Sequence, residues 1–181
     1  MVYVFLAEGF EEIEALATVD FLRRCYIEVV TVGVGSKEVT GAHNITVQAD
    51  TVESLIEKSD KLQGIVLPGG MPGTLNLQKS DLVNEVLDYS VEKGLVIGAI
   101  CAAPSILGKK GLLKGKKATC FPGFEDKLLG AEVTGEHVEV DGNIVTGKGA
   151  GATIDFARKI AEKFVGAEKA LEVKQSMQCK M

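Results

Sequence analysis

The chain has 181 residues, 46% of them hydrophobic and 25% charged, with a formal net charge of -5; this is the composition of a globular protein, and we expect one domain over residues 1–181. Lys and Arg are scattered among the acidic residues, so no basic stripe is available to neutralise phosphates, which argues against nucleic acid as a main partner. The N-terminal apolar run ends at Glu8, too early for a signal peptide or a membrane span, so we expect a cytoplasmic protein without membrane contact.

Strand-like and helix-like segments alternate along the chain. The sequence predicts strands over 2–7, 27–34, 45–49, 64–70 and 95–100, and short strands near 137–140 and 143–147. It predicts helices over 11–24, 81–93 and 152–165, another directly after Pro104, and a turn of helix within 52–58. The apolar strands lack the alternation of a half-exposed sheet, which indicates buried parallel strands with helices on both faces. Ligands of such sheets bind at the carboxyl ends of the strands, where 8–14, 68–70 and Cys101 fall.

The stretch LVIGAICAAP (95–104) places Cys101 where an apolar strand ends and a helix marked by Pro104 begins. Small residues, Ala99 and Ala103, flank the cysteine, as the tight turn of a nucleophile elbow requires. A helix N-terminus beside the sulfur would lower the pKa of the thiol and favour a reactive thiolate. Cysteine is also one of the most commonly buried residue types, so this stretch alone leaves open both a nucleophile and a structural cysteine.

Glu14, in the segment EGFEEIEA (8–15), shares one side of the predicted helix with Phe10 and Phe21. A carboxyl group among apolar neighbours is costly unless it is protonated or paired. We therefore expect a raised pKa for Glu14 and a specific partner. The alternative is that Glu14 lies at the margin of an ordinary apolar helix.

Two glycine-rich segments could present backbone N–H groups to a ligand. In VLPGGMPG (66–73), Gly69 and Gly70 follow a buried strand and could face an anion or a developing oxyanion. A plain turn is the alternative there. The segment GKGAGA (147–152) enters a helix and could hold an anion at its N-terminus, although close packing of strand and helix explains these glycines equally well.

The sequence supports neither a metal site nor a bound cofactor. It contains no C-x-x-C pair, and its few histidines provide neither a structural zinc site nor the base of a catalytic triad. The segment GVGSKE (33–38) lacks the third glycine of the dinucleotide fingerprint. We expect both histidines at the surface and all thiols reduced. The cysteines are Cys25, Cys101, Cys120 and Cys179, and the histidines are His43 and His137.

The motifs EGFEEIEA, VLPGG, AICAAP and TGKGAGATIDFA occur in this order over nearly the whole chain. Together they make the sequence similar to the ThiJ/PfpI family, and in particular to its DJ-one branch, which holds the Parkinsonism-associated protein and its bacterial relatives. The resemblance implies an α/β, flavodoxin-like fold: a three-layer sandwich with a mostly parallel central sheet and helices on both faces. It also implies a homodimer, with Ile13 and Arg24 of the first helix near the partner.

The same resemblance implies roles for five residues. Cys101 would be the nucleophile or redox-active thiol at a strained elbow, and Glu14 would be the carboxyl group hydrogen-bonded to its sulfur. Oxyanion-type donors would come from Gly69, Gly70 and the N–H of Ala102.

Two positions depart from the pattern of that family. Protease-like members carry a histidine directly after the nucleophile, where this chain has Ala102, so we do not expect peptidase activity. The DJ-one protein has a histidine near its cysteine from a later loop, where this chain has Phe121. Glu14 would then transfer protons alone or with water.

These groups favour a cofactor-free, cysteine-dependent enzyme that acts on small reactive carbonyls such as methylglyoxal, of the glyoxalase or deglycase type. Cys101 would add to the aldehyde carbon. The N–H groups of Gly70 and Ala102 would hold the oxyanion, and Glu14 would carry a proton between adjacent carbons. The alternative is a redox-sensing or chaperone-like stress-response protein whose Cys101 is oxidised rather than turned over.

Overall fold

The computed structural model describes residues 1–179, and within them the main sheet has seven strands in the order β10-β11-β7-β6-β1-β2-β5. All neighbours in this sheet are parallel except β10 and β11. The strands are β1 (Val2–Leu6), β2 (Val29–Gly33), β5 (Thr51–Val52), β6 (Gly64–Leu67), β7 (Val96–Ile100), β10 (Val138–Asp141) and β11 (Ile144–Gly147).

The strand order confirms the predicted fold class. Without the two-residue edge strand β5, the parallel strands β1, β2, β6, β7 and β11 lie in the order 2-1-3-4-5, which is that of flavodoxin-like folds. The order reverses between β1 and β6, and ligands of such folds bind beyond the carboxyl ends of the strands at this point. The segments that follow β1, β6 and β7 therefore meet at one edge of the sheet.

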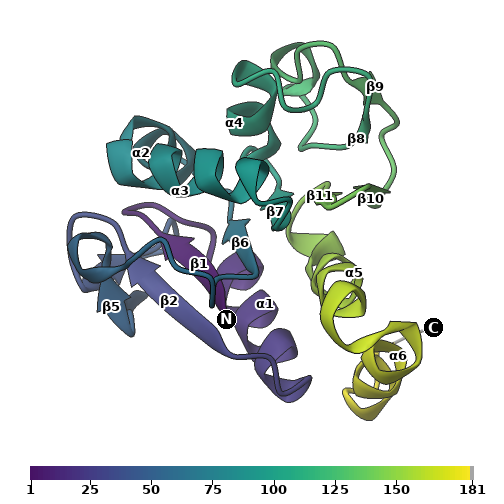
Figure 1. The fold of residues 1–181 in the computed structure, drawn as a ribbon, viewed down its shortest axis with the longest axis horizontal. Helices are drawn as coiled ribbons and strands as arrows, with labels where there is room; N and C mark the ends of the chain where they lie inside the picture. The colour runs from purple at the N-terminus through teal and green to yellow at the C-terminus, as the bar shows by residue number, and fades with distance from the viewer. Residues whose placement is uncertain (180–181) are drawn as a thin grey trace.

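Helices cover both faces of the sheet, as predicted (Figure 1). One face carries α1 (Glu12–Arg24), α5 (Thr153–Val165) and α6 (Ala167–Ser176), and the other carries α2 (Gly73–Lys79), α3 (Asp81–Glu92) and α4 (Pro104–Lys109). Each face has its own apolar core, with Phe21 and Phe156 in the first and Leu87 and Ile106 in the second. Burial of these side chains on two sides explains why the strands read as continuous apolar runs.

Several elements differ from the sequence-based expectation. The predicted strand at 45–49 forms as β4 (Thr46–Gln48), but it pairs with β3 (Glu38–Thr40) in a separate hairpin. Helices α2 and α6 were not predicted. Helix α2 directly follows a Gly/Pro-rich turn, which masks its helical pattern in the sequence, and α6 buries few apolar residues. The short elements are η1 (Glu53–Leu55), η2 (Glu125–Lys127), η3 (Ala150–Ala152), and the pair β8 (Lys117–Ala118) and β9 (Glu132–Val133).

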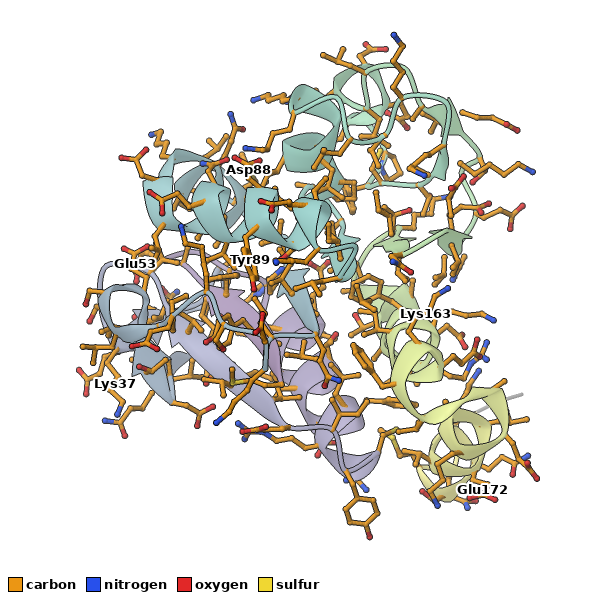
Figure 2. All side chains as sticks on the ribbon, in the orientation of Figure 1. Lys37, Glu53, Asp88, Tyr89, Lys163 and Glu172 are labelled. Carbon is orange, nitrogen blue, oxygen red and sulfur yellow. The ribbon has the colours of Figure 1, made fainter. Side chains whose placement is uncertain are left out.

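Charged side chains of both signs are spread over the outside of the fold, among them Lys37, Glu53, Asp88, Lys163 and Glu172 (Figure 2). This mixture follows from the composition, in which acidic residues exceed basic ones by a small margin. In the part of the chain that the structure describes, no helix is long and apolar enough to cross a membrane.

Candidate active site

Cys101 occupies a sharp turn between β7 and α4. Its φ is +65°, in the left-handed region, which costs a residue with a side chain about 1–2 kcal/mol. Neighbouring segments hold this conformation: the Cys101 N–H donates to the Gly147 carbonyl at 2.9 Å, and the Cys101 carbonyl accepts from the Phe121 N–H at 2.8 Å. Pro104 is the first residue of α4, as predicted. The local geometry is therefore that of a nucleophile elbow.

Gly69 packs between Cys101 and Glu14, where only a glycine fits. A Cβ atom at this position would lie 2.6 Å from Cys101 Cβ and 2.7 Å from Glu14 Oε2. The Gly69 N–H donates to Glu14 Oε2 at 2.9 Å. This contact corrects the expectation that Gly69 supplies an oxyanion donor, because its N–H group is already directed at the carboxyl group.

Two other backbone N–H groups face the sulfur. The N–H groups of Gly70 and Ala102 hydrogen-bond to the Cys101 side chain, and both favour its thiolate form. Gly70 has a φ of +89°, which a glycine adopts without strain. The structure thus brings the N–H groups of Gly70 and Ala102 to the Cys101 sulfur, and their role as donors to an oxyanion stays a prediction.

Glu14 is buried beside the thiol, with only 1% of its surface exposed. Phe10 and Phe21, its predicted neighbours on the helix, are fully buried. Burial raises the pKa of Glu14 to about 7, against the lowering effect of hydrogen bonds from Cys101 and the Gly69 N–H; the nearby Glu11 carboxylate adds to the rise. The expected raised pKa and specific partner of Glu14 are therefore both present in the structure.

The pKa of the Cys101 thiol differs from the expectation. The pKa of the thiol is raised to about 12, mainly by burial. The charge of Glu14 and its hydrogen bond with the thiol also raise the pKa, and together they outweigh the lowering by the N–H groups of Gly70 and Ala102. Helix α4 has only six residues, so its dipole is weak beside a carboxylate in direct contact. The prediction of a depressed thiol pKa was wrong, because it omitted the burial of the sulfur and the charge of Glu14.

The carboxyl and thiol groups titrate as a pair. The pair loses its first proton near pH 7 and keeps the second up to about pH 12. Between these values one proton is shared by Glu14 and Cys101, so Glu14 can accept the thiol proton as the sulfur attacks. This gives the site a general base at neutral pH without an imidazole.

Glu12 and His43 form a contact that the sequence did not reveal. Glu12 Oε1 accepts from the His43 N–H at 2.8 Å, and Glu12 Oε2 lies 2.9 Å from His43 Nδ1. Burial alone would raise the pKa of Glu12, but these hydrogen bonds bring it below its ordinary value, while the pKa of His43 is raised by the same contact. The His43 ring is exposed, as predicted, yet it fixes the β3–β4 hairpin to the start of α1, two residues before Glu14.

The remaining cysteines lie in different environments. Cys25 follows α1 and Cys120 precedes the turn at Phe121, and burial raises the pKa of both thiols. All four cysteines are free. Among the cysteines, all within the described residues 1–179, Cys101 alone has both a hydrogen-bonded carboxyl partner and two backbone donors.

The chain is similar to known proteins over almost its whole length. A model of the DJ-1/PfpI family matches residues 1–163. Glutathione-independent glyoxalase DJR-1.2 of Caenorhabditis elegans is 32% identical over 90% of this chain and 87% of its own. Protein DJ-1 homolog B of Arabidopsis thaliana is 38% identical over 97% of this chain, which spans 40% of that relative's length. The solved structure "Toxoplasma gondii DJ-1, oxidized" has a TM-score of 0.94 and 33% identity, covering 99% of this chain and 98% of that one.

We expect Glu14→Gln to stabilise the protein at alkaline pH. The folded-state pKa of about 7 lies above the ordinary 4.5, so the folded state binds the proton more tightly and stability falls as pH rises between these values. The difference corresponds to about 3 kcal/mol at pH 8. Gln keeps the acceptor for the Gly69 N–H without the charge. Denaturant unfolding at pH 4 and pH 8 measures the effect.

Glu12→Gln is the matched control, because the pKa of Glu12 is lowered and its ionised form stabilises the fold. That variant should lose stability at pH 8. If the two variants shift stability in the same direction, the assignment of a destabilising charge to Glu14 is wrong.

Alkylation of Cys101 should rise with pH through about 7, where the pair loses its first proton. An ordinary thiol rises instead near a pKa of about 8.5. Glu14→Gln should remove the step near pH 7, because the amide cannot accept the thiol proton. Iodoacetamide labelling of native protein, followed by peptide mass spectrometry, gives the rate for each cysteine. An identical pH profile in wild type and Glu14→Gln would contradict the shared-proton pair.

Proposed function

The chain belongs to the DJ-1/PfpI family, and we propose that it is a cofactor-free enzyme that converts 2-oxoaldehydes into 2-hydroxy acids. The observation that carries the proposal is the contact of the Cys101 thiol with a carboxyl group whose pKa is about 7. A group with this pKa can both accept and return a proton at neutral pH. The glyoxalase named among the relatives supports the same reaction class.

The first step is addition of the Cys101 thiol to the aldehyde carbon. The S–C bond forms while the thiol proton passes to the Glu14 carboxylate, and the carbonyl electrons move to the oxygen. The N–H groups of Gly70 and Ala102, which face the sulfur, are placed to hold this oxyanion. Return of the proton from Glu14 gives a hemithioacetal and restores the carboxylate.

The second step moves a hydrogen between adjacent carbons. Glu14 removes the proton from the former aldehyde carbon, which leaves an enediolate, and then delivers it to the neighbouring ketone carbon, while the hydroxyl proton on the former aldehyde carbon passes to the ketone oxygen. The product is a thioester of Cys101 with a 2-hydroxy acid. Water then attacks the thioester, the C–S bond breaks, and the thiol is regenerated. The sum is one water added per substrate, with no external oxidant or reductant.

A second candidate function, supported by the same contacts, is redox sensing or a related chaperone-like stress response. Donors that face a sulfur stabilise the oxygen atoms of a sulfenate or sulfinate as well as those of an adduct. The oxidised Toxoplasma gondii relative is consistent with that chemistry in the family. Peptidase activity is not proposed, because Ala102 occupies the position after the nucleophile and His43 is engaged by Glu12.

Purified protein should consume methylglyoxal and form lactate without glutathione, and the rate should rise with pH through about 7. Cys101→Ser should abolish turnover. Glu14→Gln should lower it by roughly 10²-fold or more, the usual contribution of general acid–base catalysis. Cys120→Ser, at a buried thiol outside the Cys101–Glu14 pair, is the control and should keep the wild-type rate.

Redox sensing predicts a different outcome. Wild type would not turn over methylglyoxal at any pH, whereas hydrogen peroxide would convert Cys101 to a sulfinate before it oxidised the other three cysteines.

We also propose that two copies associate through α1, because Ile13 is 56% exposed on its surface with the apolar Leu16 beside it. Ile13→Asp should convert a dimer into a monomer, since a charge buried in an apolar interface is costly. Light scattering after gel filtration measures the mass. Leu55→Asp, at an exposed leucine outside α1, is the control and should leave the mass unchanged. A monomeric wild type would refute this proposal.

A further inference from the structure

A surface hollow of about 370 Å³ lies next to segments that hydrogen-bond to the backbone of Cys101. It is lined by Phe121, Pro122, His137, Lys148 and residues 149–152. The Phe121 ring is 47% exposed and lies over Gly149, where a Cβ atom would be 3.3 Å from Phe121 Cδ2. The ring, Pro122 and small residues give the hollow a largely apolar wall.

The walls of the hollow are connected directly to Cys101. The Phe121 N–H donates to the Cys101 carbonyl, and Gly147, which precedes Lys148, accepts from the Cys101 N–H. Strand β7 lies between β6, whose end carries the Gly69 loop, and β11, which leads into the hollow. Cys101 is not itself a lining residue of the hollow, and these two backbone hydrogen bonds are what join the hollow to the elbow.

Lys148, a charged residue of the hollow, is held by backbone carbonyl groups. Lys148 Nζ donates to the Gly135 carbonyl at 2.8 Å, and the Lys148 N–H donates to the His137 carbonyl at 2.9 Å. These bonds fix the wall formed by Lys148 to the loop before β10. The exposed side chains on the remaining wall include the Phe121 ring and His137.

We propose that this hollow binds the substituent on the ketone carbon of the substrate, and that the preferred substrates are 2-oxoaldehydes with an aromatic or bulky apolar substituent. The inference rests on the proposed function and specifies its substrate class. The hollow has the volume of about a dozen liquid waters, far more than the methyl group of methylglyoxal needs. A phenyl group can stack against Phe121, a contact worth about 0.5–1.5 kcal/mol beyond the burial of apolar area.

The kinetic test compares kcat/KM for phenylglyoxal with kcat/KM for methylglyoxal. Phe121→Ala should lower the ratio of the two roughly tenfold, whereas Phe121→Tyr, which keeps the ring, should preserve it. Phe124→Ala removes an aromatic ring from the same loop outside the hollow, and it should leave the ratio unchanged. Thermal unfolding establishes that each variant is folded. An unchanged ratio in Phe121→Ala overturns the inference.

A binding test separates this inference from the proposed function. Mandelamide and lactamide are neutral analogues of the products that differ only in carrying phenyl or methyl. Mandelamide should slow iodoacetamide labelling of Cys101 at lower concentration than lactamide, and Phe121→Ala should remove the difference. Equal protection by the two amides overturns the inference whatever the turnover. Absence of turnover on both aldehydes, with protection by mandelamide intact, overturns the proposed function alone.

Discussion

The burial of one carboxyl group, that of Glu14, determines how the rest of the site is built. A carboxylate removed from water is costly, and the folded protein offsets part of that cost with the Gly69 N–H and the Cys101 thiol. The compensation is incomplete, so the pKa stays near 7 instead of returning to the range of an exposed glutamate. This incompleteness is useful, because a fully stabilised carboxylate would be too weak a base to take a thiol proton.

The fold places this carboxyl group through backbone contacts at the point where the strand order reverses. The Glu11 N–H donates to the Gly69 carbonyl at 3.0 Å, and the Gly73 N–H donates to the Gly9 carbonyl at 3.1 Å. A Cβ atom at Gly70 would lie 2.4 Å from the Glu11 nitrogen. The loops after β1 and β6 are therefore in direct backbone contact, so Glu14 and the Cys101 elbow are positioned by rigid elements rather than by flexible side chains.

Local patterns in the sequence were sufficient for part of this arrangement and insufficient for the rest. The small residues around Cys101 and the apolar neighbours of Glu14 predicted the turn and the raised carboxyl pKa, since both follow from steric and solvation effects within a few residues. The direction of the Gly69 N–H and the raised thiol pKa depend on which groups meet across the sheet, which spacing does not encode. The pairing of Glu12 with His43 joins residues 31 positions apart, and it was missed for the same reason.

Position 121 holds a phenylalanine, so its side chain takes no part in proton transfer. An imidazole there would provide a second proton carrier near the sulfur and would compete with Glu14 for that role. Phe121 cannot exchange a proton, so under the proposed function the proton transfers at the sulfur fall to Glu14, which shares one proton with Cys101. Under the proposed function, the exposed ring and small residues of the hollow would contact the substituent of the substrate and take no part in the proton transfer at the thiol.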